Sequence, residues 1–146
     1  MSKSDTFEND LLKLLFNNTA IANIGDAGGI LGSAVAGSLY VALFTSDPGE
    51  AGSAITNETA YTGYTRTAVV RSGAGFTVTG NSVSPAAHID FTVCTASPGG
   101  AITHWGIVNT SSGAGKLLYS GTVTPNITMA VNTAPRLTTA STVTED

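Results

Sequence analysis

The spacing of apolar side chains changes once along this chain, near residue 38. Before that point, apolar residues recur at the three- and four-residue intervals of one helical face. They are Phe7, Leu11, Leu14 and Leu15, and Leu12 and Phe16 widen the stripe. Asp5 can cap such a helix, with Glu8 three residues later completing a capping box. The pattern predicts an amphipathic helix over residues 5–16, whose stripe covers either its own β-domain or a neighbouring subunit.

After a glycine-rich linker or irregular arm at residues 25–38, the period becomes that of β-strands. In residues 75–79, for example, Phe76 and Val78 share one face while Thr77 and Thr79 share the other. Runs of this kind, separated by turn residues, are 39–45, 65–71, 75–79, 88–93, 102–108, 116–123, 127–131 and 137–143. Their regular spacing predicts a mainly β fold, an antiparallel β-sandwich that is jelly-roll-like with about eight strands.

This change of period also predicts the domain organisation. Residues 1–38 would form an N-terminal helix with a glycine-rich arm, and residues 39–146 would form the β-sandwich domain. The sharpest boundary inside the second part is Ser46-Asp47-Pro48-Gly49, which ends the apolar run from Leu39. Proline followed by glycine matches a type II turn, which needs a fixed φ first and a positive φ next. The chain is therefore expected to leave its first strand through a tight corner.

Composition narrows the possible partners. Charged residues make up only 11% of the chain, the net charge is −4, and the six Lys and Arg residues are scattered. A protein that binds nucleic acid needs a basic patch, so no nucleic acid partner is expected. The uncharged stretch at residues 27–44 is rich in glycine and is flanked by Asp26 and Asp47 instead of Lys or Arg, so no membrane span is expected. A polar but uncharged surface suits contact with other proteins.

Few residues are of types that could act in catalysis or metal binding. His88 and Asp90 share a strand face, but only His104 and scattered acids could complete a metal site, so neither a metal nor a catalytic residue is predicted. The lone Cys94 lies in a strand-like run and is expected to be a buried, inert thiol.

The remaining patterns leave the choice of ligand open. The glycine-rich segments lack the Gly-Lys-Ser/Thr ending of a phosphate loop, so no cofactor is predicted. Asp47 and Glu50 lack the regular acid spacing of a calcium loop. A sugar platform built from Tyr61 and Tyr64 stays open as an alternative.

Several segments, in the same order along the chain, carry a resemblance to a known group. They are Phe7-Glu8-Asn9-Asp10-Leu11-Leu12, the strand and turn from Leu39 to Gly52, Gly63-Tyr64-Thr65-Arg66, Thr103-His104-Trp105-Gly106-Ile107 and Gly115-Lys116-Leu117-Leu118-Tyr119-Ser120-Gly121. Together they resemble small virion structural proteins of tailed bacteriophages, a group often labelled phage tail fibre protein. The resemblance implies a protein of the virion, made in the bacterial cytoplasm, with no catalytic activity.

The favoured hypothesis is a capsid decoration, or cement, protein that stabilises the head through protein–protein contacts. Its partners would be the major capsid protein or other virion proteins, and it would form a homo-oligomer. The interface candidates are Phe7, Leu11, Tyr64 and Trp105, because large apolar and aromatic groups dominate interface energetics. The alternatives are a tail, neck or baseplate accessory or fibre subunit, and a carbohydrate-binding module for host attachment.

Overall fold

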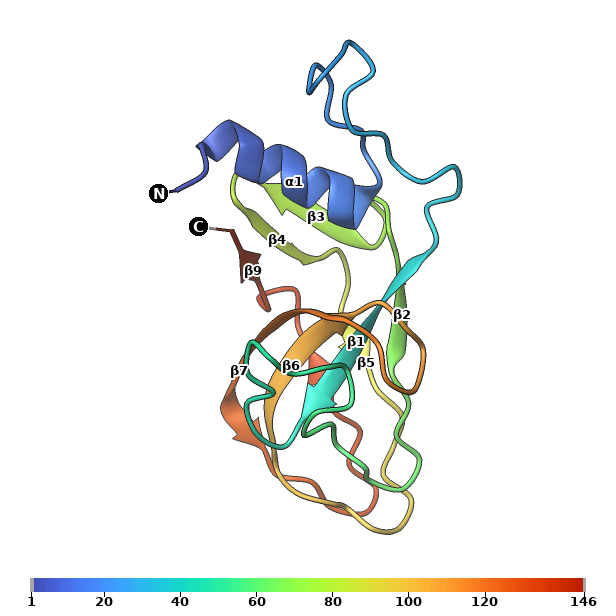
Figure 1. Ribbon diagram of the computed structural model, residues 1–146. Coiled ribbons are helices and arrows are strands. Elements are labelled where there is room, and N and C mark those ends of the chain that lie inside the picture. Colours follow the sequence, from blue (N-terminus) through green and yellow to red (C-terminus); the bar gives the residue numbers. More distant parts are fainter. Residues whose placement is uncertain (1, 146) are drawn as a thin grey trace. The chain divides into compact units, whose positions relative to one another are not determined.

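The computed structural model describes residues 2–145 and contains one α-helix and nine β-strands in that range (Figure 1). The elements are α1 (Asp5–Asn17), β1 (Ser38–Phe44), β2 (Thr67–Val70), β3 (Phe76–Thr79), β4 (Ser82–Pro85), β5 (Ile89–Asp90), β6 (Ile102–Val108), β7 (Leu117–Ile127), β8 (Arg136–Leu137) and β9 (Val143–Thr144). The described residues form two compact units: unit 1 holds 2–38, 69–88 and 138–145, and unit 2 holds 39–68 and 89–137. The expected division at residue 38 stays a prediction.

Unit 1 is built from α1 and a small sheet in the order β3-β4-β9. The helix packs on β3 and β4, and Phe16 meets the ring of Phe76 edge to face with 5.0 Å between ring centroids. The hairpin pairs Phe76 with Pro85, and β4 pairs Val83 with Val143 of β9. These contacts place the helix against its own chain, which was one of the two predicted partners of its apolar stripe, the other being a neighbouring subunit.

Two details of the predicted helix are wrong. The N-cap is Ser4, whose hydroxyl accepts a hydrogen bond from the Phe7 amide, so the Asp5–Glu8 capping box does not form. The fully buried apolar residues of α1 are Leu12 and Phe16, in line with the buried Glu8, whereas Phe7 is 37% exposed. The helix is therefore rotated toward the Leu12 and Phe16 edge of the predicted stripe, because its partner hairpin contacts the i, i+4 row that begins at Glu8.

Unit 2 contains most of a four-stranded sheet in the order β2-β1-β6-β7 and the short β5–β8 pair. Strand β1 pairs antiparallel with β6, which places Leu43 opposite Trp105, and β6 pairs antiparallel with β7, which places Trp105 opposite Gly121. The core lies along β1 and β6, where Val41, Leu43 and Ile107 are almost completely buried. Gly106 is required there, because a Cβ atom would lie only 2.6 Å from the Tyr119 carbonyl oxygen.

The mainly β class with one helix and antiparallel pairing is confirmed, but a sandwich of about eight strands is not. The predicted strand at 116–123 continues as β7 to Ile127, although Pro125 interrupts the sequence pattern, and the predicted strand at 127–131 is wrong because residues 128–131 are irregular. Strand β4 is not among the predicted strands, and its proline is tolerated because Pro85 is its last residue, where the missing N–H group costs little. The turn after β1 is confirmed, with Gly49 at φ 68° and the Asp47 carboxylate accepting its N–H group at 2.8 Å.

Candidate protein-contact surface

The segment at residues 18–37, called the arm below, joins α1 to β1 and lies in unit 1 (Figure 1). Its backbone is irregular but hydrogen-bonded to itself. Ile21 and Ile30 exchange N–H···O bonds of 2.9 and 2.8 Å, and the Asn18 side chain donates to the Ser33 carbonyl and accepts from the Ser33 N–H group. The arm is therefore a structured loop and not a flexible linker.

Arg71 fixes the arm to the end of the helix. Its guanidinium donates to the carbonyl oxygens of Leu14 and Leu15 at 2.8 and 2.7 Å, and to that of Ala36 at 3.2 Å. The helix carbonyls it contacts belong to the last turn, where a positive charge is favourable. This role was not predicted, and the only signal in the sequence is an arginine at the end of a strand in a chain with six basic residues.

The outer part of the arm exposes apolar side chains. They are Ile24 (39%), Ile30 (43%), Leu31 (72%) and Val35 (78%). Asp26 is the one charged residue of the arm, and the stretch after it is uncharged as far as Asp47. Apolar groups that a hydrogen-bonded loop holds in solvent are typical of a protein-contact surface. The arm was predicted only as a linker or irregular segment, and its four apolar side chains were not nominated.

The four nominated interface residues lie in different surroundings. Phe7 and Leu11 are partly exposed on α1. Trp105 is only 6% exposed, in the centre of the β1-β6-β7 region. The Tyr64 hydroxyl donates to Glu58 Oε1 at 3.0 Å and accepts from the Leu43 N–H group at 3.1 Å. The contact role of all four stays a prediction, and for Trp105 and Tyr64 the structure supplies a role inside the chain.

Glu58 joins Tyr64 to a second partner, Arg66. The guanidinium donates from Nε to Glu58 Oε1 at 2.6 Å and from Nη2 to Oε2 at 2.8 Å. Its remaining N–H groups donate to the carbonyl oxygens of Ala54, Thr110 and Gly113 and to the Thr110 hydroxyl. The Glu58 hydrogen bond raises the pKa of Arg66, and burial raises the pKa of Tyr64 well above its usual value. This cluster joins two loops of unit 2, the β1–β2 connection and the β6–β7 connection.

Other sequence candidates are occupied by structural contacts. The Asp90 carboxylate pairs with the Arg136 guanidinium on exposed strand ends. Cys94 is buried, with its thiol directed at the Ser97 carbonyl oxygen at 3.5 Å. Tyr61 is 2% exposed and donates to the Thr92 carbonyl oxygen, so the proposed sugar platform of Tyr61 and Tyr64 is wrong.

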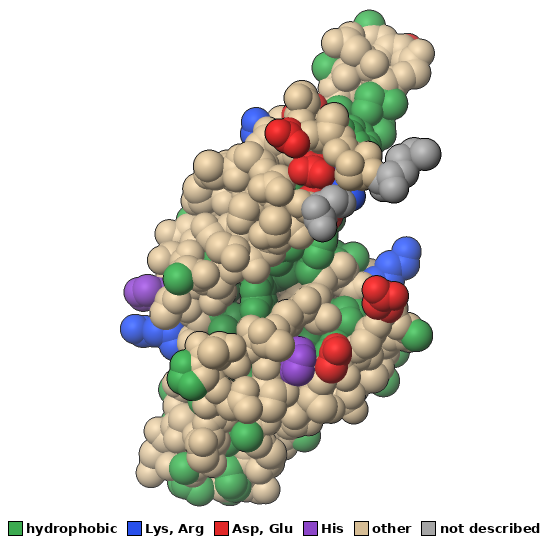
Figure 2. Space-filling model, turned by 90° about the vertical axis from the view of Figure 1, so that its left-hand side faces the viewer, with side chains coloured by type: hydrophobic (Ala, Val, Ile, Leu, Met, Phe, Trp, Pro, Cys, Tyr) green, Lys and Arg blue, Asp and Glu red, His purple; other side chains and the backbone are tan. Residues whose placement is uncertain are grey.

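Within residues 2–145, no three His, Cys, Asp or Glu side chains converge as ligands for a metal ion. No helix in that range has the length and apolar character needed to cross a bilayer. Figure 2 shows the charged side chains as separate groups on a mostly uncharged face. Nine large apolar side chains are exposed among the described residues, and four of them belong to the arm.

Comparison with known protein families shows which family the chain belongs to. The family described as podophage GP4 fiber I protein gp80 matches residues 2–145. The chain belongs to this Gp80 family. The resemblance to tail fibre-type virion proteins is thereby confirmed over nearly the whole sequence, and the chain is a structural component of a phage virion. No curated protein matches it significantly.

Proposed function

We propose that this Gp80-family chain is a subunit of the virion's fibre apparatus that acts by binding other virion proteins, without catalysing a reaction. The observation that carries the proposal is the match of residues 2–145 to a family described as a podophage fibre protein. The arm supports it, because its four exposed apolar side chains form part of a surface that another protein can cover. The low content of charged residues supports it as well, since charged groups are depleted at the centres of interfaces.

The experiment replaces exposed apolar residues of the arm and measures incorporation into particles. A phage lacking its own copy of the gene is complemented with Leu31→Ser/Val35→Ser, and purified particles are quantified by mass spectrometry. We expect the variant to fold and yet be depleted from particles at least tenfold, because burying a Leu or Val side chain contributes about 1.5–3 kcal/mol and about 1.4 kcal/mol is a factor of ten in affinity. The matched control is Ile55→Ser, which removes an apolar side chain that is 52% exposed in unit 2. Equal incorporation of all three proteins would contradict a contact role for the arm.

Capsid decoration is the second candidate, and the same apolar arm on a weakly charged subunit is the observation that favours it. The family description favours the fibre. Copy number separates the two, because a decoration protein covers a shell in hundreds of copies and a fibre subunit is present only at the fibres. Labelling of intact particles with a specific antibody adds the location. Labelling all over the head, together with a copy number near that of the major capsid protein, would favour decoration over the fibre.

A further inference from the structure

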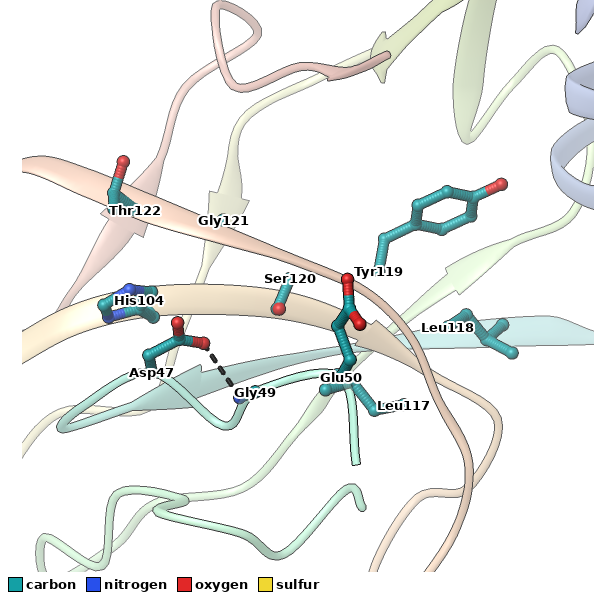
Figure 3. A pocket seen from close by; sticks show the side chains of 10 residues that line it. All are labelled: Asp47, Gly49, Glu50, His104, Leu117, Leu118, Tyr119, Ser120, Gly121 and Thr122. Carbon is teal, nitrogen blue, oxygen red and sulfur yellow. Dashed lines mark hydrogen bonds between the residues drawn. The ribbon is translucent and has the colours of Figure 1, made fainter. Parts of the chain in front are cut away.

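Unit 2 contains a cavity of about 570 Å³ that neither the fold nor the contact surface explains (Figure 3). The turn after β1 forms one wall with Asp47, Gly49 and Glu50, and the rest is His104 of β6 with residues 117–122 of β7. Its volume lies within the range of pockets that bind small organic molecules. All of its lining residues belong to one unit, so the cavity does not depend on any other part of the chain.

The lining is rich in groups that form hydrogen bonds. Asp47 and Glu50 supply two carboxylates, His104 supplies an imidazole, and Ser120 and Thr122 supply hydroxyls, whereas the Tyr119 ring is directed away from these groups. Figure 3 shows the Asp47 carboxylate directed toward the His104 ring. His104 Nδ1 is 2.8 Å from the Thr103 hydroxyl, which leaves Nε2 as the ring nitrogen for a ligand. Among the described residues, no ion pair joins either carboxylate to this histidine.

The charge of the lining limits the class of ligand. Two carboxylates and no Lys or Arg line the cavity, so anions are disfavoured by like-charge repulsion. A metal ion is disfavoured as well, because no three acidic, histidine or cysteine side chains within residues 2–145 converge as ligands. Carboxylate oxygens accept hydrogen bonds from pairs of neighbouring hydroxyl groups, and a hydroxyl or imidazole can donate in return. The lining therefore matches a ligand with many hydroxyl groups and no negative charge.

We propose that this cavity is a binding site for a saccharide that is neutral or carries an amino group. Asp47 and Glu50 accept hydrogen bonds from the sugar, and His104 with the hydroxyls of Ser120 and Thr122 holds the opposite side. The site is open and lacks a stacked aromatic wall, so binding is weak for one sugar unit and gains strength where several copies act together. The site is distinct from the arm, which lies in unit 1.

The test is a titration of the ¹⁵N-labelled full chain by NMR with three sugars that share one ring: glucose, glucosamine and glucuronate. Methyl mannoside and N-acetylglucosamine widen the neutral set. We expect saturable amide shifts in the millimolar range, confined to residues 47–50, 104 and 117–122, with a neutral or amino sugar and not with glucuronate. No saturable shift with any of the neutral or amino sugars would overturn the proposal. Equal shifts with glucuronate, or shifts with ethanolamine in place of sugars, would overturn it too.

Variants tie the shifts to the named side chains. Asp47→Asn/Glu50→Gln removes both charges, and asparagine can still accept the hydrogen bond from the Gly49 N–H group that holds the turn. We expect binding about tenfold weaker, since hydrogen bonds to charged groups are the stronger ones. Asp10→Asn on α1 is the matched control outside the cavity and should bind like the unchanged protein. Unaltered affinity of the double variant would sink the assignment, whereas incorporation into particles tests the proposed function separately.

Discussion

Arg66 binds Glu58 through two parallel hydrogen bonds, Nε to Oε1 at 2.6 Å and Nη2 to Oε2 at 2.8 Å. Their side chains are only 2% and 15% exposed, so the pair is nearly shielded from water. A buried ion pair of this kind offsets its desolvation penalty only if the remaining N–H groups and oxygens of the two side chains also form hydrogen bonds. Arg66 meets that condition by donating to loop carbonyl oxygens at Ala54, Thr110 and Gly113. Two residues of the β1–β2 connection thus hold that loop together and fix it to the β6–β7 connection.

The first prediction concerns the loss of this arginine. Arg66→Met keeps a long side chain but removes the guanidinium that donates to the Glu58 carboxylate and to three loop carbonyl oxygens, so that Glu58 keeps the Tyr64 hydroxyl as a donor and loses its counter-charge. We expect the free energy of unfolding to fall by about 3 kcal/mol, as when one partner of a buried ion pair is removed. Urea denaturation measures this. The control is Arg136→Met, whose pair with Asp90 is more than half exposed, and it should unfold close to the unchanged protein. Equal effects of both variants would contradict the buried network.

The second prediction concerns alkaline pH. Burial raises the pKa of Tyr64 above its ordinary value of 10.0, and it also raises that of Tyr61. The unfolded chain therefore ionises these hydroxyls at a lower pH than the folded chain does. Their contribution to stability is complete below about pH 10 and is lost as the pH rises above it, by up to about 1.4 kcal/mol per pH unit for each tyrosine.

Urea denaturation between pH 8 and pH 11.5 measures this loss, in roughly half-unit steps of pH. Tyr64→Phe should make the decline above pH 10 less steep, at a cost of about 1 kcal/mol at neutral pH from the lost hydrogen bonds with Glu58 and Leu43. Tyr61→Phe gives a second comparison. A decline with the same slope in all three proteins would show that these hydroxyls do not govern alkaline unfolding.

The third prediction separates the two faces of α1. Leu12 is fully buried against the β3–β4 side of unit 1, whereas Phe7 is 37% exposed. Leu12→Ala should lower the free energy of unfolding by about 2–5 kcal/mol, because it leaves a cavity. Phe7→Ala should cost less than about 1 kcal/mol, as a surface change does. Thermal or urea unfolding measures both, and a larger effect at Phe7 would mean that the predicted face, and not the observed one, is buried.

Local pattern predicted the elements that depend on neighbouring residues. The helix at 5–16, the strand at 102–108 and the turn at Pro48-Gly49 were all found, because period and turn chemistry act over a few residues. The layout of the sheets was not predictable in this way. Pairing of Val83 with Val143 joins segments sixty residues apart, and no periodicity in either segment records that partner.

The same limit applies to the sites. Arg66 belongs to a segment that sequence comparison singled out, but its partners at Thr110 and Gly113 become neighbours only after folding. Trp105 was nominated as a contact residue because a buried and an exposed aromatic residue look alike in sequence. The arm was overlooked for a related reason. Its glycines indicated flexibility, and only the hydrogen bonds of Asn18 and Arg71 show that it is held in place.

The fourth prediction links the hydrogen-bonded conformation of the arm to incorporation of the protein into phage particles. Arg71→Met removes the donors that hold Leu14, Leu15 and Ala36, so the arm should open more often while the rest of the chain stays folded. Hydrogen exchange should be at least about tenfold faster at the Ile21 and Ile30 amides, and unchanged at Ala54 and Thr59 in unit 2. Lys116→Met, at an exposed residue, is the control. Since a pre-ordered loop binds with a smaller loss of conformational entropy, the variant should also be incorporated into particles less well. Normal protection of the arm in Arg71→Met would show that Arg71 does not hold it.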